Sequence, residues 1–273
     1  MTGIGIGGFI LSPLLTLWIE AYTWRGAYMI YAGLVLVILI PVNLFLLKDK
    51  PEDLGLTAFE TEVTEDSQQI ASQQVAFNFS FNAAKTKPFF ILLLVGMVTN
   101  GIVNSGALGQ YPPAFEEVHT PIFAATIISI YSIVGIFGKL ILGAVNDKFG
   151  ILVSIYYGCG LIILASLLAL YADKVPVAYL LALTFGLGNA IGSVLPPLLT
   201  TTFFSGPDFA KAYGVISSAL QLGMTTGSLF IAYIFDFTGS YTTGWYVLLA
   251  LSFITFLTWV LAYKNGKKLS QAA

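Results

Sequence analysis

Charge is scarce in this sequence: Asp, Glu, Lys and Arg make up 10% of the residues, whereas hydrophobic residues make up 57%. A soluble globular domain carries about 25% charged residues, so the composition excludes that class and indicates an integral membrane protein. The net charge is -2 and there is no long basic run, which leaves no basis for nucleic-acid binding. The few basic residues are therefore interpreted first as determinants of membrane topology.

Cysteine and histidine are almost absent, with one residue of each. Cys159 lies in an apolar run; it excludes an internal disulfide or a cysteine metal cluster, and we expect a buried, inert thiol. His119, beside Thr120 and Pro121, is interpreted as a solvated loop residue. No nucleophile–base set, metal cluster or phosphate-binding loop appears. We therefore predict that the protein is not an enzyme and that it has no cofactor and no metal site.

Long apolar segments, by contrast, fill most of the chain. Each is near the ~20 residues that cross a hydrocarbon core of ~30 Å. There are eight, at residues 3–19, 27–47, 89–111, 122–145, 151–172, 176–203, 210–235 and 242–263. The sequence therefore predicts an all-α integral membrane protein with eight transmembrane helices.

One long polar stretch, residues 48–88, divides these segments into a region at 1–47 and a region at 89–265, which is followed by a tail at 266–273. Its acidic, glutamine and serine residues predict a linker on one side of the membrane. Within it, the alternating phenylalanines of residues 77–82 fit either a short strand or a surface loop that leads into a short helix.

The lysines predict which side of the membrane the linker occupies. An even number of spans puts both termini on one side, and nine lysines fall there: Lys48, Lys50, Lys85, Lys87, Lys148, Lys211, Lys264, Lys267 and Lys268. Only Arg25 and Lys174 fall on the other side. Because cytoplasmic loops are enriched in Lys and Arg, we predict a multi-pass plasma-membrane protein with its linker and both termini in the cytoplasm.

Two turn motifs resemble those of a known family. Residues 143–150 are GAVNDKFG, which fits the turn pattern Gly-x-x-x-Asp-[Arg/Lys]-x-Gly, and residues 236–241 are DFTGSY. At these positions the sequence resembles a Major Facilitator Superfamily transporter. Residues 22–26 (YTWRG) and 48–56 (KDKPEDLGL) resemble the monocarboxylate and oxalate:formate antiporter branch of that family.

The resemblance implies a fold of twelve spans, in which the eight predicted spans correspond to helices five through twelve. Residues 1–47 would then be the last two helices of the N-terminal bundle, and residues 89–265 the complete six-helix C-terminal bundle. The implied function is secondary active transport of a small organic anion, a carboxylate, by alternating access, with this chain as a fragment of a longer transporter. The alternative is a truncated membrane protein or scaffold that does not transport. Expected partners are the anion, the lipid bilayer, and the missing N-terminal half or a second copy.

Polar residues inside the spans are the candidates for a substrate site, because transporters of this kind bind their substrates near the midplane. Asn100 and Asn104, four residues apart, share one helix face. Ser217, Gln221, Thr225 and Ser228 form a stripe on a later span. Interhelical hydrogen bonding is the alternative role for the asparagines of this pair, and for the glycine-rich stretch around Asn189 packing with a hinge is favoured over direct substrate contact. The predicted substrate-binding set is Asn100, Asn104, Tyr131, Lys139, Asn189, Gln221 and Thr225.

Lys139 is the one ionisable residue placed well inside a span. It precedes Asp147 by eight residues, or about 12 Å along a helix. Snorkelling to the headgroups and an anion site both explain such a lysine. The resemblance favours the anion site, because monocarboxylate transporters carry an arginine at the matching place; the aspartate that precedes it there by four residues is replaced by Gly135. No acidic residue lies near the middle of a span, so this chain has no candidate for proton coupling through a buried carboxylate.

The resemblance further implies that the turn at residues 143–150 is a cytoplasmic latch in which Gly143, Asp147, Lys148 and Gly150 act in gating. We expect the Asp147 side chain to accept hydrogen bonds from the free N–H groups of the next helix. Gly143 is expected to permit close helix contact, and Gly150 to permit the tight turn.

Overall fold

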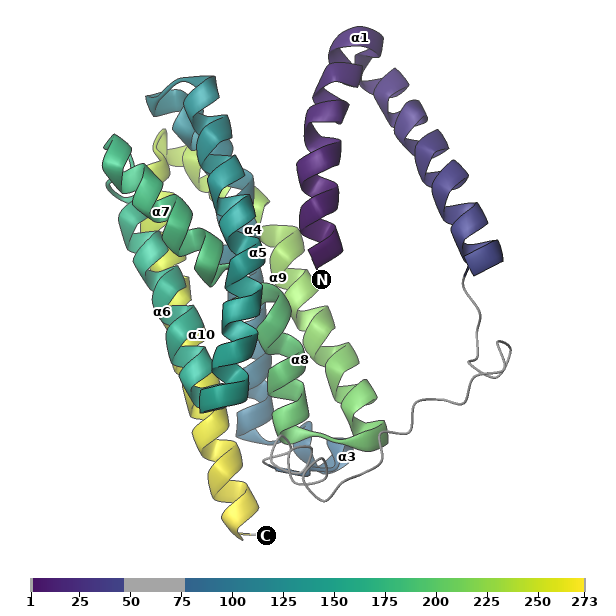
Figure 1. The fold of residues 1–273 in the computed structure, drawn as a ribbon. Helices are drawn as coiled ribbons and strands as arrows, with labels where there is room; N and C mark the ends of the chain where they lie inside the picture. The colour runs from purple at the N-terminus through teal and green to yellow at the C-terminus, as the bar shows by residue number, and fades with distance from the viewer. Residues whose placement is uncertain (1, 47–76, 273) are drawn as a thin grey trace. The chain divides into compact units, whose positions relative to one another are not determined.

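The computed structural model describes residues 2–46 and 77–272. The chain divides into two units, Met1–Ala71 and Ser72–Ala273, here called unit 1 and unit 2. The described residues of each are helical apart from short connections (Figure 1), so the predicted all-α fold is confirmed. Residues 48–76 of the predicted linker lie outside the described residues.

Unit 1 contains helix α1 (Thr2–Pro41) and a short π-helical turn, η1 (Val42–Leu46). Thr23 interrupts α1, because its φ of 63° and ψ of 167° are not helical. The two arms of α1 therefore form a hairpin (Figure 1). At the hairpin turn, the Arg25 guanidinium lies over the Trp24 ring, 5.0 Å from its centroid. The arms correspond to the two helices predicted at residues 3–19 and 27–47.

Unit 2 contains one short helix and seven longer ones. Helix α4 packs against α9 and α10, α5 packs against α7, and α6 packs against α7 and α10 (Figure 1). The helices are α3 (Phe81–Ala84), α4 (Pro88–Val118), α5 (Pro121–Phe149), α6 (Ile151–Ala169), α7 (Val175–Gly188), α8 (Ile191–Phe203), α9 (Gly206–Thr238) and α10 (Tyr241–Ala272).

Seven helical segments among the described residues are long and apolar enough to cross a membrane. They are Ala21–Leu44, Pro88–Val118, Pro121–Phe149, Ile151–Ala169, Val175–Phe203, Gly206–Thr238 and Tyr241–Gln271. Seven of the eight predicted spans therefore meet both criteria. The eighth, residues 3–19, is helical as the first arm of α1.

The span predicted as one helix at residues 176–203 is instead two helices, α7 and α8, separated at Asn189 and Ala190. At this break the Gly192 N–H donates to the Asn189 carbonyl, and the Ser193 N–H to the Ala190 carbonyl. These bonds span three residues rather than four, as in a 3₁₀ turn. Glycine has a low preference for the helix interior, which explains why the helix breaks in this glycine-rich stretch.

Helices α4, α5, α9 and α10 extend beyond the apolar segments that predicted them. Helix α5 continues to Phe149 and is followed by Gly150 at φ 81°, and α9 is followed by Gly239 at φ 68°. Helix α10 continues to Ala272, through residues that we had assigned to the tail. Backbone hydrogen bonding does not require apolar side chains, so these helices continue past the apolar residues. Helices α5 and α9 end where a glycine takes a positive φ.

Helices α4 and α9 approach each other closely at glycines. A Cβ atom on Gly223 would overlap the Val98 carbonyl oxygen, and one on Gly227 would overlap the Ile102 carbonyl oxygen. Such small-residue contacts let backbones approach in lipid, where apolar burial provides little association energy. Gly223 and Gly227 therefore allow α4 and α9 to pack closely.

Residues 77–80 run extended along the end of α8 but form no strand. The Phe77 N–H donates to the Thr202 carbonyl and the Phe79 N–H to the Phe203 carbonyl, both at 3.0 Å. The Phe77 and Phe203 rings stack with centroids 5.6 Å apart. Helix α3 follows directly. Of the two predicted alternatives, the loop that leads into a short helix is confirmed and the strand is wrong.

Candidate functional site

Asn104 and Asn189 form a hydrogen bond between α4 and the break that separates α7 from α8. The Asn104 amide nitrogen donates to the Asn189 side-chain oxygen, and Asn104 is 6% exposed. Gly192 lies against the same amide group. These contacts fit interhelical hydrogen bonding, the alternative role that the sequence left open for Asn104.

Asn100 is also buried within unit 2, at 1% exposed, and its Nδ2 atom has no hydrogen-bond partner among the described residues. Hydroxyl pairs link helices in the same interior. Thr99 and Thr255 lie 2.7 Å apart, and Ser166 and Ser252 lie 3.2 Å apart. These four hydroxyl residues could not be identified from the sequence, because single Ser and Thr residues in a span give no signal of their partners.

Lys139 and Tyr131 lie on α5 in different surroundings. Tyr131 is buried, and its ring meets Phe185 edge to face with centroids 5.4 Å apart. Lys139 is half-buried, next to Gly138, where a Cβ atom would contact the backbone of Leu187. Within residues 2–46 and 77–272, Lys139 makes no ion pair, since one pair alone, Lys211 with Asp208, is found there.

The polar stripe of α9 divides into two environments. Gln221 and Thr225 are exposed on unit 2, and the Thr225 hydroxyl donates to the Gln221 carbonyl at 2.8 Å. Ser228 instead accepts hydrogen bonds from the Gln110 amide at its backbone carbonyl and its hydroxyl, each at 3.1 Å. The stripe therefore does not present one continuous polar face to a single neighbour.

The turn at residues 143–150 corrects two expectations about the predicted latch. Asp147 is exposed and does not cap α6, whose N-cap is Gly150, with no side-chain hydrogen bond to the helix. A Cβ atom on Gly143 would meet nothing within 4 Å, so no close helix contact forms there among the described residues. Gly150 does provide the expected tight turn, at φ 81°. Lys148 lies near Phe149, with its Nζ atom 5.3 Å from the ring centroid.

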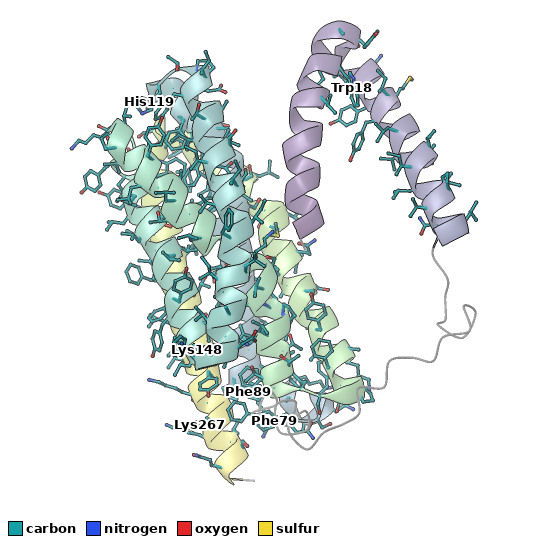
Figure 2. All side chains as sticks on the ribbon, in the orientation of Figure 1. Trp18, Phe79, Phe89, His119, Lys148 and Lys267 are labelled. Carbon is teal, nitrogen blue, oxygen red and sulfur yellow. The ribbon has the colours of Figure 1, made fainter. Side chains whose placement is uncertain are left out.

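His119 is not the solvated loop residue that we expected. It is half-buried, its Nε2 atom lies 3.1 Å from the Ala172 carbonyl oxygen, and its ring centroid is 4.3 Å from that of Phe123. His119 thus joins the connection between α4 and α5 to the connection between α6 and α7. Figure 2 shows it at one end of unit 2, and Lys148 and Lys267 toward the other.

The predicted substrate-binding residues do not converge on one hydrogen-bonded site. Asn104 with Asn189 is the one side-chain pair among the seven that is joined in the described part of the chain. That part also has no group of three or more His, Cys, Asp or Glu side chains placed to hold a metal ion. Cys159 is buried, as predicted.

Known proteins of similar sequence identify the family of this chain. Residues 1–204 match the Major Facilitator Superfamily. Monocarboxylate transporter 12 of Homo sapiens is 23% identical over 279 residues, covering 89% of this chain and 51% of that protein. Monocarboxylate transporter 12 of Xenopus laevis is 26% identical over 270 residues, covering 89% of this chain and 55% of that protein. The chain thus spans about half the length of these relatives.

The match to the family extends over most of the chain, residues 1–204 of 273, and includes the hairpin of unit 1 and helices α4 to α8 of unit 2. It agrees with the all-helical fold and the seven membrane-length segments. The chain therefore belongs to the Major Facilitator Superfamily, and its similarity to known proteins lies in the monocarboxylate transporter branch.

Proposed function

We propose that the chain acts in secondary active transport of a small carboxylate by alternating access. Membership in a transporter family supports transport, and the name of the related monocarboxylate transporter 12 supports the substrate class. The single observation that carries the proposal is Lys139, a half-buried cation inside α5 with no ion-pair partner among the described residues.

A lysine inside a membrane helix costs a few kcal/mol unless it faces a cavity or reaches the interface. A carboxylate substrate would supply the counter-charge that Lys139 lacks among the described residues, and its charge-assisted hydrogen bond would be stronger than a neutral one. Gln221 and Thr225, exposed on α9, are proposed to contribute polar contacts to the same substrate path. Asn100, Asn104, Asn189 and Tyr131, which are packed within unit 2, are proposed to hold its helices together.

The arrangement proposed for the whole transporter follows the same family. Unit 1 would supply the last two helices of the N-terminal bundle, and unit 2 the six helices of the C-terminal bundle. The turn at residues 143–150 would act as a cytoplasmic gate, with both termini and the linker on that side of the plasma membrane. Partners would be the anion, the bilayer, and an N-terminal half or a second copy.

Uptake of radiolabelled lactate into proteoliposomes tests the proposal. The chain is reconstituted alone and after co-expression with the part of human monocarboxylate transporter 12 that it does not cover. Replacement of Lys139 by Gln is expected to lower uptake about tenfold or more, because a hydrogen bond to a charged group contributes about 1.5–3 kcal/mol. Lys139→Arg should retain uptake, since it keeps the charge.

The matched control is Lys174→Gln, which removes a lysine at the start of α7, outside the proposed substrate path. It should leave lactate uptake unchanged. Unchanged uptake in Lys139→Gln would show that Lys139 only snorkels to the interface. If the chain takes up no lactate in either preparation while it is inserted and folded, the non-transporting alternative is supported instead.

A further inference from the structure

A pocket of about 390 Å³ lies at the end of unit 2 that carries His119. Its wall comes from the last turns of α4, the connection between α6 and α7, Leu181 of α7, and the segment Gly239–Trp245 that leads into α10. None of the seven predicted substrate-binding residues lines it. Its volume lies within the range of small-molecule sites, which runs from about 300 to 1,000 Å³.

Two almost buried side chains present polar atoms to this pocket. Tyr111 is 2% exposed and Trp245 is 7% exposed, and both line the pocket. Neither the Tyr111 hydroxyl nor the Trp245 Nε1 atom hydrogen-bonds to a described residue. Among the described residues, the fully buried polar side-chain atoms that lack a hydrogen-bond partner are Asn100 Nδ2 and Trp259 Nε1, so the list does not include Tyr111 or Trp245. The polar atoms of Tyr111 and Trp245 therefore keep some accessible surface, and both residues line the pocket.

The aromatic wall of the pocket is built from rings in contact with one another. The Trp245 ring stacks on Tyr241 with centroids 5.6 Å apart, and it lies tilted by 53° against Tyr111 with centroids 5.2 Å apart. Aromatic faces carry negative electrostatic potential and attract ammonium groups. A wall of this kind favours a ligand that combines an apolar body with a positive charge.

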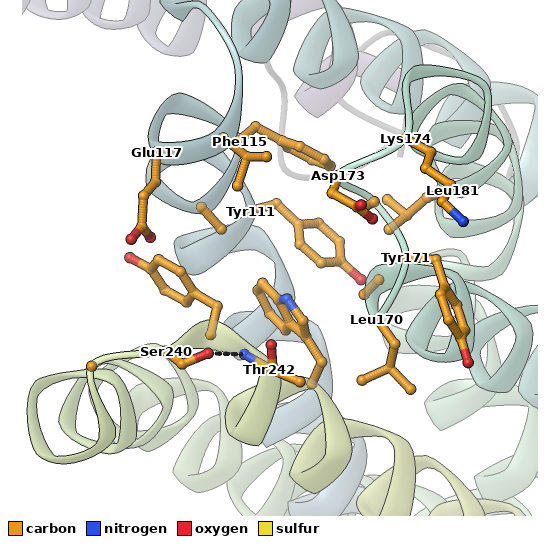
Figure 3. Close-up of a pocket in the computed structure, with 17 residues that line it drawn as sticks. Tyr111, Phe115, Glu117, Leu170, Tyr171, Asp173, Lys174, Leu181, Ser240 and Thr242 are labelled. Carbon is orange, nitrogen blue, oxygen red and sulfur yellow. Dashed lines mark hydrogen bonds between the residues drawn. The ribbon is translucent and has the colours of Figure 1, made fainter.

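The charged side chains that line the pocket carry a net negative charge, which would attract a positively charged ligand. Glu117 and Asp173 line the pocket with one cation, Lys174, so the lining carries a net charge of -1. Figure 3 shows Tyr111 in the middle of the pocket, with Glu117 on one side and Asp173 on the other. Among the described residues, no third His, Cys, Asp or Glu side chain lies with these two carboxylates in a group that could hold a metal ion. This favours an organic cation over a metal ion.

We infer that this pocket binds a small organic ammonium ion, with its apolar body on the rings of Tyr111, Tyr241 and Trp245 and its charge toward Glu117 and Asp173. The Tyr111 hydroxyl oxygen would accept a hydrogen bond from the ammonium group. This inference is independent of the proposed function. The ligand has the opposite charge to a carboxylate, and the pocket shares no residue with the proposed transport site.

Three probes with one ring and different charges test the ligand class: benzylamine, benzyl alcohol and benzoate. Each is titrated calorimetrically into the full chain in nanodiscs, without any substrate gradient. Benzylamine should bind tightest, about tenfold more strongly than benzyl alcohol, since cation–π and carboxylate contacts together contribute roughly 1–2 kcal/mol. Benzoate should bind weakest.

Variants then test the assigned residues. Glu117→Gln and Asp173→Asn should each weaken benzylamine binding about threefold to fivefold, and leave benzyl alcohol binding unchanged. The matched control is Glu116→Gln, which removes the neighbouring carboxylate that does not line the pocket. Unchanged benzyl alcohol binding also verifies that each variant retains the folded pocket.

Other results would overturn the inference. Equal affinities for the three probes would reduce the site to an apolar crevice, and a preference for benzoate would assign it to anions through Lys174. Failure of benzylamine to bind to a chain with intact thermal unfolding would also overturn it. None of these results bears on lactate uptake, so the two proposals fail separately.

Discussion

The asparagines of unit 2 show how the environment of a single polar residue in a span decides its role. Asn104 has a hydrogen-bond partner in Asn189, whereas the Asn100 Nδ2 atom, also buried, has none in the part of the chain that the structure describes. Thr225 satisfies its hydroxyl within its own helix and stays exposed. Residues of similar polarity therefore differ in their surroundings: one pair is hydrogen-bonded between helices, one buried amide group lacks a partner, and one hydroxyl group is exposed at a surface.

A double-mutant cycle on Asn104 and Asn189 is expected to give a coupling free energy of about 0.6 kcal/mol and at most about 1.7 kcal/mol, the average and the maximum found by such cycles for interhelical hydrogen bonds in a membrane protein. The variants are Asn104→Ala, Asn189→Ala and the double variant, and the free energy of unfolding is measured in mixed micelles. Thr225→Ala serves as the control, and should change stability by less than about 0.5 kcal/mol. A coupling energy of zero would mean that the hydrogen bond contributes no stability.

At the scale of elements, the pairing of α4 with α9 depends on glycine positions rather than on hydrophobicity. Gly223 and Gly214 lie on the same helix, nine residues apart, but in opposite environments. A Cβ atom on Gly223 would overlap the backbone of α4, whereas one on Gly214 would meet nothing within 4 Å.

Replacement of these two glycines by alanine should therefore change stability in opposite directions. Gly223→Ala is expected to lower the free energy of unfolding by about 1–3 kcal/mol, because the helices must separate. Gly214→Ala is expected to raise it by about 0.5–1 kcal/mol, because alanine favours the helix. Equal effects in chemical unfolding experiments would contradict the close approach of α4 and α9.

The turn between α5 and α6 provides a second test at this scale. Gly150 has φ 81° and ψ 175°, a region that is almost exclusive to glycine, so Gly150→Ala should destabilise the protein by about 1–3 kcal/mol. Gly143→Ala is the matched control, since its Cβ atom would occupy open space. If Gly143→Ala is nevertheless the variant that reduces lactate uptake, a contact outside the described residues is required at Gly143.

At the scale of the whole molecule, the orientation in the membrane is testable because the chain has one cysteine, and it is buried. Cys159 should not react with a membrane-impermeant maleimide. Glu116→Cys, at the end of α4, should react in intact cells. Lys267→Cys, near the end of α10, should react only after permeabilisation. The unmodified chain is the control, and the opposite labelling pattern would reverse the topology that the lysines predict.

The helical spans and their order could be predicted from the sequence because hydropathy is a sum over neighbouring residues, and each span needs only its own ~20 residues to satisfy the bilayer. The lysine bias and the turn motifs are local in the same way. Gly150 and Gly239 occupy the turns that those motifs predicted. The family could also be inferred from these motifs, and the match at residues 1–204 agrees with it.

The partners of the polar residues were decided by the tertiary structure alone. Whether Asn104 faces a cavity or Asn189 depends on the rotation of α4 and on the break between α7 and α8, which involve residues 85 positions apart. The same holds for the pocket around Tyr111 and Trp245, whose wall combines four helices. A local pattern reports which residues are polar or apolar, but side-chain packing between distant segments sets the rotation and spacing of helices, and thus which residues meet.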